Sequence, residues 1–240
     1  MKELQKLLSK IRQATEHYEM ISKGDKIAVG VSGGKDSAAL LYSLAKLRDF
    51  YPAHFDVCAI SVDMGFDSED LYASTLKISE SLGIEHHLVK TQIADIVFNE
   101  RKEKNPCALC SKLRRGALVG EAVSMGANKL ALGHHLDDVV ETFMMSLMHE
   151  GRIGCFCPVT VYDNNQISVI RPLIYAKESE VAAVARAADL PTIVNPCPED
   201  GESQRAEMKE YLKSFDRSHR GLYKRVLGAL ERSCIDGWHE

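Results

Sequence analysis

The first residues whose types and spacing suit chemistry form the sequence SGGKDS at 32–37. Its glycines can adopt positive φ and let the backbone approach a ligand, and its aspartate and second serine stand where a helix N-cap is expected. Unpaired backbone N–H groups at such a turn suit an anion such as phosphate. We therefore expect a phosphate-binding loop made of Ser32, Gly33, Gly34, Lys35, Asp36 and Ser37. A glycine turn that only joins a strand to a helix is the alternative.

Two common nucleotide-binding loops do not fit this stretch. The loop G-x-x-x-x-G-K-S/T, aligned on Gly34, would need glycine at Val29 and serine or threonine at Asp36. The dinucleotide fingerprint G-x-G-x-x-G fails because Gly30, Gly33 and Gly34 have the wrong spacing. The sequence therefore indicates a different kind of phosphate loop.

A second group of chemically active residues lies in LGHHLDDVVETFMMSLM at 132–148. Asp137 and Asp138 fall in the first turn of an expected helix, where the macrodipole favours negative charge. With Gly133 and His134 they follow an expected strand, so the carboxylates could hold Mg²⁺ against nucleotide phosphates or move a proton. Simple helix capping stays open as an interpretation, and zinc is disfavoured because the histidines are not spaced i, i+4.

A third group is the cysteine motif NPCALCSKLRRG at 105–116. Cys107 and Cys110 form C-x-x-C, which can chelate a metal, ligate an iron–sulfur cluster or cycle through a disulfide. Cys197 also follows Asn-Pro, so we favour these three thiols as one ligand set over sets that use CFC at 155–157. Three thiolates leave one iron of a cubane cluster open to an outside ligand.

These three groups need a scaffold that brings them together. The chain alternates strand and helix patterns, with strands expected at 26–31, 55–62, 86–90, 129–133 and 167–173. Such alternation predicts an α/β fold with a parallel sheet and helices on both faces. Ligands of such sheets bind at the carboxyl ends of the strands. The loop at 32–37, Asp63 and the segment after Gly133 are therefore expected on one rim.

Composition narrows the class of protein. The 240 residues suffice for one domain with a substantial core, and no apolar run approaches the roughly 18 residues that span a bilayer. Seven cysteines, an odd number, without an export signal disfavour a disulfide framework and favour the cytoplasm. The net charge of −4 does not exclude a nucleic-acid partner, because a local basic patch is enough.

Taken together, the motifs resemble a known family. SGGKDS resembles the S-G-G-x-D-S loop of the PP-loop (N-type) ATP pyrophosphatases. Its combination with CALCSKLRRG, GHHLDD, IRPL and Cys197, in unbroken order, resembles the TtcA-type tRNA-cytidine 2-sulfurtransferases. That family usually has a second C-x-x-C, of which Cys197 is the first cysteine, and here Asp200 replaces the second. Cys155 and Cys157 lie outside the family pattern.

The resemblance implies a fold and a reaction. The fold is a parallel five-stranded sheet with helices on both faces, in a PP-loop ATP-binding domain at 25–200 between an N-terminal helix at 1–24 and a C-terminal helical tail at 201–240. The cofactors are ATP, Mg²⁺ and a [4Fe-4S] cluster on Cys107, Cys110 and Cys197. The reaction is adenylation of an anticodon-loop cytidine, position 32, and replacement of its 2-oxygen by sulfur. A thiouridine synthase, a lysidine-type ligase and a nucleotide-binding redox module are the alternatives.

The resemblance and the chemistry of the side chains also suggest individual roles. Asp36 and Asp138, with Asp137 beside them, are expected to hold Mg²⁺ or the nucleotide, and Asp63 the nucleoside. Arg114, four residues after the second cysteine, is expected to stabilise charge on the activated base, with phosphate contact as the alternative.

The expected partners follow from the same comparison. We expect tRNA to contact Lys112, Arg114, Arg115 and the basic segment 216–225. A sulfur donor such as a cysteine desulfurase is the second expected partner, and the resemblance suggests a homodimer with no membrane association.

Overall fold

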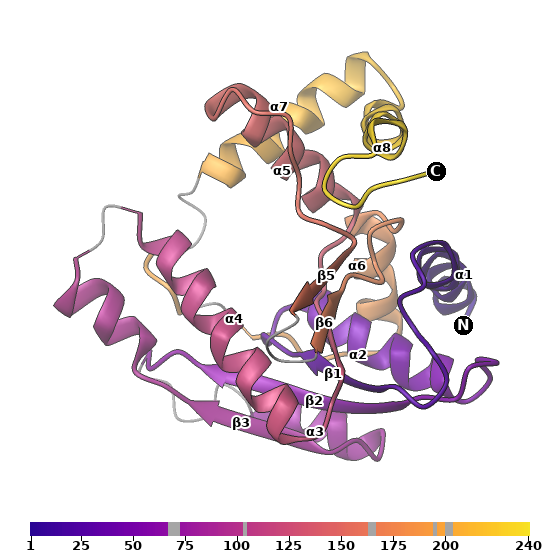
Figure 1. Ribbon diagram of the computed structural model, residues 1–240, viewed down its shortest axis with the longest axis vertical. Helices are drawn as coiled ribbons and strands as arrows, with labels where there is room; N and C mark the ends of the chain where they lie inside the picture. Colours follow the sequence, from indigo (N-terminus) through magenta and orange to yellow (C-terminus); the bar gives the residue numbers. More distant parts are fainter. Residues whose placement is uncertain (67–72, 103–104, 163–166, 194–195, 200–203) are drawn as a thin grey trace.

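The computed structural model describes residues 1–66, 73–102, 105–162, 167–193, 196–199 and 204–240. A six-stranded sheet lies at its centre, in the order β3-β2-β1-β4-β6-β5 (Figure 1). Its strands are β1 (Lys26–Gly30), β2 (Asp56–Asp63), β3 (His86–Lys90), β4 (Lys129–Ala131), β5 (Val159–Tyr162) and β6 (Ile167–Ile170). The helices are α1 (Lys2–His17), α2 (Lys35–Arg48), α3 (Ala73–Ser81), the π-helix η1 (Asp95–Glu100), α4 (Pro106–Ser124), α5 (Leu136–His149), α6 (Glu178–Ala187), α7 (Gln204–Ser218) and α8 (Leu222–Ser233).

The α/β architecture confirms the expected fold class, but the expected number of five strands was wrong. All pairs from β3 to β6 are parallel, and β5 adds an antiparallel edge strand against β6. This edge strand has only four residues, VTVY, and one of them, Val161, is 63% exposed. A strand this short and this exposed lacks the apolar pattern that marked the other five.

Alternate residues of the central strands face two separate hydrophobic clusters. Ile27 and Val29 of β1 face the cluster that contains α1, α2 and α6, whereas Ala28 between them faces the cluster beneath α4. Cys58 and Ile60 of β2 also face the α4 side. Helices therefore cover both faces, as the period of two in a strand requires.

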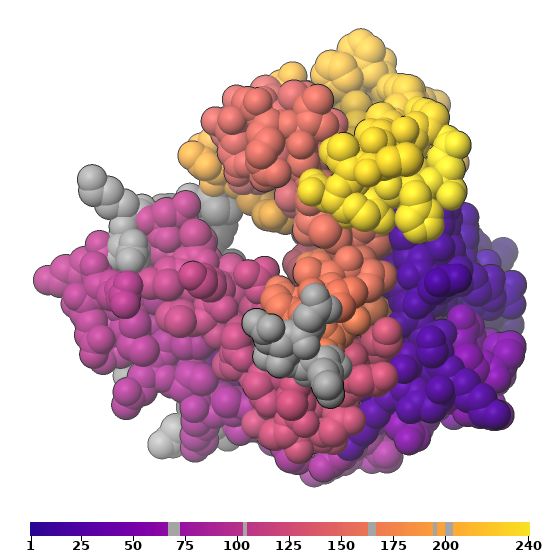
Figure 2. Space-filling view, viewed as in Figure 1, coloured from indigo at the N-terminus to yellow at the C-terminus, as the bar shows by residue number. Residues whose placement is uncertain are grey.

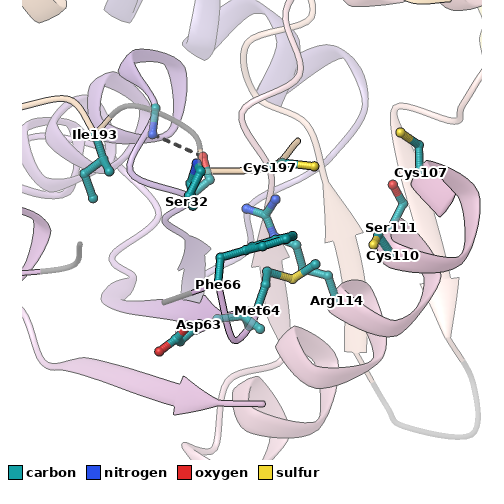
Figure 3. Close-up of a pocket in the computed structure, with 13 residues that line it drawn as sticks. Ser32, Asp63, Met64, Phe66, Cys107, Cys110, Ser111, Arg114, Ile193 and Cys197 are labelled. Carbon is teal, nitrogen blue, oxygen red and sulfur yellow. Dashed lines mark hydrogen bonds between the residues drawn. The ribbon is translucent and has the colours of Figure 1, made fainter. Parts of the chain in front are cut away.

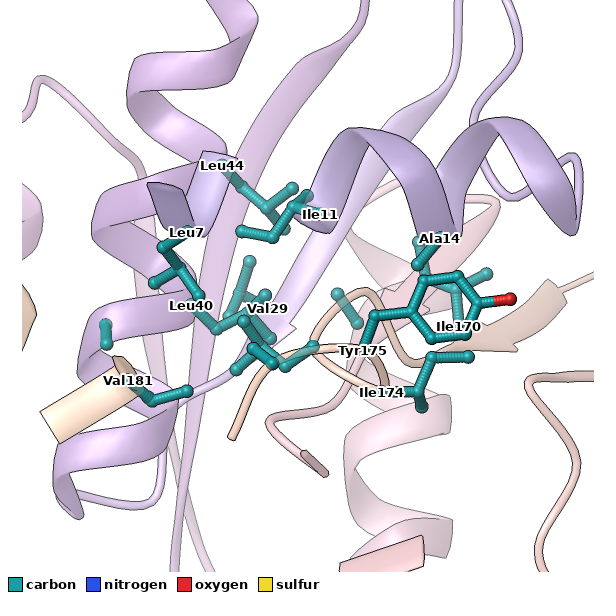
Figure 4. Close-up of a cluster of buried hydrophobic side chains, with 14 of the residues drawn as sticks. Leu7, Ile11, Ala14, Val29, Leu40, Leu44, Ile170, Ile174, Tyr175 and Val181 are labelled. Carbon is teal, nitrogen blue, oxygen red and sulfur yellow. The ribbon is translucent and has the colours of Figure 1, made fainter. Parts of the chain in front are cut away.

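Both ends of the chain pack on the same side of this sheet (Figure 1). Leu7 and Ile11 of α1 are fully buried beside Val29 and residues of α2 (Figure 4). Near the other terminus, Trp238 is 1% exposed and lies in the same cluster. Within the described ranges, no helix is long and apolar enough to cross a membrane.

Candidate functional site

The phosphate loop connects the end of β1 with the first turn of α2. Gly33 has a φ of +85°, and a Cβ there would lie 2.6 Å from Cδ1 of Ile193, so side chains are excluded for two reasons. Gly34 has a φ of −77° and is the N-cap of α2. The expectation of an N-cap at Asp36 or Ser37 was therefore wrong: the helix starts earlier because Gly34 already has the extended backbone that an N-cap needs.

The two serines close the loop with hydrogen bonds of their own. The backbone N–H of Ser32 donates to Oγ of Ser37 over 3.0 Å, and the two hydroxyl oxygens lie 3.1 Å apart. The Ser37 hydroxyl donates to the carbonyl of Gly34 over 2.9 Å. These hydrogen bonds fix the shape of the loop, which is the preorganisation that an anion site needs.

Lys35, in the same motif, points away from the two serines toward α6. Its Nζ lies 2.9 Å from Oε1 of Glu178 and 3.1 Å from Oδ2 of Asp36, and Lys209 of α7 lies 2.7 Å from Oε2 of Glu178. Burial raises the pKa of Glu178, but hydrogen bonds from Lys209 and Lys35 outweigh this effect and lower the pKa to about 2. Lys35 therefore ties the loop to α6 and α7, a role that the sequence motif did not reveal.

The segment after β4 packs directly against the first turn of α2. A Cβ at Gly133 would lie 3.2 Å from the backbone of Asp36 and Ser37, so glycine permits this approach. His135 is the N-cap of α5 and forms a capping box with Asp138: its N–H donates to Oδ2 over 2.9 Å, and its Nδ1 accepts from the N–H of Asp138 over 3.4 Å. The capping interpretation of Asp138 is therefore correct. The same side chain also lies on the rim of the sheet.

The remaining carboxylates of the rim have different environments. Asp137 accepts a hydrogen bond from the N–H of Glu178 over 2.7 Å, which makes it a cap for α6. Oδ1 of Asp138 lies 3.3 Å from Arg205 of α7. Oδ1 of Asp36 is buried and has no hydrogen-bond partner among the described residues. Asp36 thus has a buried oxygen that a ligand could use.

A pocket of about 330 Å³, here called the cysteine pocket, joins the phosphate loop to the cysteine motif. Its lining residues are Ser32, Gly34, Val62, Asp63, Met64, Phe66, Cys107, Cys110, Ser111, Arg114, Ile193, Pro196 and Cys197. Asp63 ends β2, and its Oδ1 accepts from the N–H of Gly65 over 2.9 Å. Figure 3 shows Cys107 and Cys110 on the first turns of α4, Cys197 on a separate segment, and the Arg114 side chain extending into the pocket.

The three cysteines line the same pocket, and the charge of Cys197 affects the pKa of the other two thiols. Burial raises the pKa of the Cys107 and Cys110 thiols, and the nearby Cys197 raises both further. Within the part of the chain that the structure describes, however, no three His, Cys, Asp or Glu side chains are close enough together to hold a metal ion. The structure thus gathers the thiols around one space without closing them on a common centre.

The other cysteines lie outside the pocket lining. Cys155 is packed beside Val139, and burial raises its pKa to about 12. Cys58 is fully buried in β2, and Cys234 is exposed after α8.

A second pocket, of about 370 Å³ and here called the arginine pocket, also borders the phosphate loop. Its lining residues are Gly30, Ser32, Asp36, Ser37, Ser111, Arg114, Arg115, Leu118, Leu132, Gly133, His134, Asp138 and Arg171. It shares Ser32, Ser111 and Arg114 with the cysteine pocket. Figure 2 shows the surface hollowed between α4 and the segments of β6 and α5. In the sequence, Arg171 stands out only as part of IRPL. Its burial directly after a strand marks it as a residue of the site.

The comparisons with known proteins agree with this geometry. The model of the PP-loop domain family matches residues 3–213. The NH3-dependent NAD synthetase of Campylobacter jejuni, 16% identical, has the same fold with a TM-score of 0.53 over 93% of this chain and 86% of that chain. Fold and site together thus define a protein of the PP-loop class.

More similar proteins narrow this class. A tRNA-cytidine(32) 2-sulfurtransferase of Geobacter metallireducens is 38% identical over 95% of this chain and 90% of its own length. One from Shewanella pealeana is 36% identical over 98% of this chain and 76% of its own. The U34-tRNA thiolase NcsA of Methanococcus maripaludis, solved with its [4Fe-4S] cluster, has a TM-score of 0.81 and 26% identity, over 96% of this chain and 78% of that chain. The chain belongs to the tRNA-cytidine(32) 2-sulfurtransferase family.

Proposed function

We propose that the protein is an ATP-dependent sulfurtransferase that converts cytidine 32 of tRNA into 2-thiocytidine. One observation carries this proposal: the phosphate loop and the three cysteines, far apart in the sequence, line a single pocket (Figure 3). Nucleotide chemistry and sulfur chemistry can then act on one base held between them.

ATP fits across the two pockets. Val62, Met64 and Phe66 give the cysteine pocket an apolar wall for the adenine, with Asp63 beside them for the ribose. The loop hydroxyls and the N–H groups at the start of α2 suit the β- and γ-phosphates. Asp36 and Asp138 both line the arginine pocket and would hold Mg²⁺, which neutralises phosphate charge when it is bound.

The donor set fits a [4Fe-4S] cluster. Cys107, Cys110 and Cys197 are three soft ligands around one pocket, and none of the three thiols is fully buried. These three thiolates would hold such a cluster, which would supply sulfur for transfer to the bound base. Arg114 lines both pockets and lies one helical turn after Cys110, so its charge can stabilise the activated base.

The reaction divides into two displacements. The 2-oxygen of the cytosine ring attacks the α-phosphorus of ATP, and the bond to the bridging oxygen breaks, so that pyrophosphate leaves. Sulfur at the sulfide level then attacks C2, and the C2–O bond breaks, so that AMP leaves with the former base oxygen. The first step needs the preorganised charges around the phosphate loop, because negative charge develops on the leaving pyrophosphate.

The tRNA contacts are proposed to include α7 and the start of α8. Residues 204–225 hold seven lysines and arginines against three acidic residues, in a chain whose net charge is −4. Tyr211 and Phe215 of α7 are 51% and 37% exposed, and the Phe215 ring stacks on His219 at 4.3 Å. Exposed rings between cations suit unpaired bases of an anticodon loop. A cysteine desulfurase as sulfur donor and a homodimer remain further parts of the proposal.

Deletion of the gene in its host tests the proposed function. We expect digested total tRNA to lose 2-thiocytidine, with recovery by the intact gene but not by Cys107→Ala. An unchanged thionucleoside profile in a host without a second copy would refute the proposal. Loss of a thiouridine would retain the mechanism and change the base.

A further inference from the structure

Arg171, directly after β6, is a buried cation with an incomplete set of partners. It is 5% exposed, and its NH1 group donates to the carbonyl of Cys157 and, over 3.2 Å, to Oγ1 of Thr160. Its Nε–H has no partner, and no carboxylate pairs with it, among the residues that the structure describes. Burying a charge without a counter-ion is unfavourable unless a ligand supplies one.

The guanidinium stays charged at neutral pH despite its burial. Burial lowers the pKa of Arg171 to about 10, and the charge of the neighbouring Arg115 lowers it as well. Burial, followed by the charge of Arg171, lowers the pKa of His134 to about 4. A fixed positive charge therefore faces the arginine pocket beside a neutral imidazole.

A small framework of side chains fixes Arg171 and His134 in place. The Arg171 guanidinium lies 5.0 Å from the centre of the Phe156 ring, and the His134 ring lies 4.9 Å from the same ring. The indole N–H of Trp238 donates to the carbonyl of Phe156 over 3.0 Å. Asp236 accepts from the N–H of Cys155 over 2.9 Å. The C-terminal segment thus orients the cation from outside the pocket.

The residues that line the arginine pocket suit a metal-bound phosphate chain. Asp36 has a buried oxygen without a described partner, and Nδ1 of His134 is likewise buried and unpartnered among the described residues. Both line the same pocket as Arg171 and the loop hydroxyls of Ser32 and Ser37. Cations and hydroxyls suit phosphate oxygens, and carboxylates suit the Mg²⁺ that accompanies them.

We propose that Arg171, held on Phe156, binds the pyrophosphate leaving group of the adenylation step. This proposal rests on the proposed function. When the bond between the α-phosphorus and the bridging oxygen breaks, the electron pair stays on that oxygen, and the added negative charge falls on the pyrophosphate. A preorganised cation at this place stabilises that charge without having to reorient.

Inhibition by inorganic pyrophosphate, measured against ATP, is the test. In Arg171→Met we expect the inhibition constant to rise at least about tenfold, because charge-assisted contacts to phosphate are strong. Arg171→Lys, which keeps the charge but loses the planar fork, should lie in between. Arg12→Met, which removes an arginine from the exposed face of α1, should behave as the wild type. The tRNA dissociation constant should stay within about twofold in all three, because the proposed phosphate is not part of the RNA.

Pyrophosphate inhibition unchanged in Arg171→Met, or a loss of tRNA affinity in its place, would overturn the proposal. If Arg171→Met does not fold, thermal unfolding of the wild type and of Arg171→Lys tests the proposal instead. Pyrophosphate with Mg²⁺ should raise the wild-type Tm and raise that of Arg171→Lys less, since at a given ligand concentration a tighter ligand stabilises the folded state more. Equal shifts would contradict the inference. The thermal readout needs no tRNA and no turnover, so failure of the proposed function would show separately, as an unchanged 2-thiocytidine level.

Discussion

The phosphate-loop side and the cysteine side of the site are held in different ways. On the loop side, Ser32 and Ser37 bond to each other, and Asp138 caps its own helix. On the cysteine side, Cys107 is exposed and Cys110 is partly exposed, and the described residues form no closed metal-ligand group. The loop is organised by its own hydrogen bonds, whereas the thiols are gathered loosely around a space that a cofactor can fill.

This difference makes the two sides separable. Changes to the thiols should remove sulfur transfer and leave the nucleotide chemistry, because Ser32 and Ser37 hold the phosphate loop through hydrogen bonds within the loop itself. Changes to the loop should remove nucleotide chemistry and leave the cluster. Variants on each side can therefore separate sulfur transfer from nucleotide chemistry.

The largest effect is expected from the cysteines of the pocket. Cys107→Ala, Cys110→Ala and Cys197→Ala should each abolish thiolation and lose the cluster's iron, since thiolates are its only covalent tether to the protein. Anaerobic iron content per chain and product formation are the readouts. Cys234→Ala, which removes an exposed thiol outside the pocket, is the matched control. Full iron in Cys197→Ala, with loss in Cys155→Ala or Cys157→Ala, would show that the third ligand was wrongly chosen.

On the loop side, Asp138→Asn should lower the rate of AMP formation by at least about 100-fold while iron content stays normal. The amide oxygen can still accept the capping bond from His135, but the charge that would hold Mg²⁺ is lost. Asp56→Asn is the control, because Asp56 is exposed at the start of β2, at the end of the strand opposite the rim. Loss of iron together with AMP formation in Asp138→Asn would mean that the two sides are not separable.

The two glycines of the loop should differ strongly from each other. Gly33→Ala is expected to cost about 1–2 kcal/mol for its left-handed backbone and to clash with Ile193, so ATP binding and stability both fall. Gly34→Ala needs no unusual backbone, and its Cβ would meet only Oγ of Ser32, at 3.5 Å, among the described atoms. ATP affinity and urea unfolding of both variants would check this. Equal losses would show that the geometry of the loop is wrong.

The smallest effect concerns a support beneath the loop. The Ser61 hydroxyl donates to the carbonyl of Val31, just before the loop, and its oxygen lies 2.9 Å from Nε2 of His86. Burial lowers the pKa of His86 from 6.5 to about 4, so folding favours the neutral form of the ring. The resulting stability is present above pH 6.5 and is lost as the pH falls toward 4.

His86→Gln should therefore reduce the loss of stability on acidification. We expect the wild type to lose more unfolding free energy than the variant between about pH 7 and about pH 5, as urea unfolding would measure. A pH dependence that is the same in both proteins would exclude His86 as its source.

Much of the loop side could be predicted from the sequence because its signals are local. SGGKDS and the strand before it lie within twelve residues, and the turn chemistry of Gly33 is a property of that residue type. The edge strand β5 escaped prediction because four half-exposed residues carry no clear period. The contacts of Lys35 with Glu178 and of Asp138 with Arg205 join residues far apart in the chain, so no local pattern contains them.

The cysteine side was predictable only in part, because its residues come from distant parts of the sequence. The C-x-x-C spacing marks a ligand pair, but the third ligand depends on where the chain returns to the pocket. Arg171 was visible in the sequence as one letter of a motif, and only its burial without a carboxylate partner among the described residues gave it a role.

Isotope labelling can show whether the loop side activates the base oxygen that the cysteine side then replaces. A tRNA carrying ¹⁸O at the 2-oxygen of cytidine 32 is incubated anaerobically with the cluster-loaded protein, ATP, Mg²⁺ and a sulfide source, and the AMP is analysed by mass spectrometry. Adenylation of that oxygen predicts one ¹⁸O atom in the phosphate of AMP for each 2-thiocytidine formed. Unlabelled AMP alongside 2-thiocytidine, or ADP as the nucleotide product, would contradict the account.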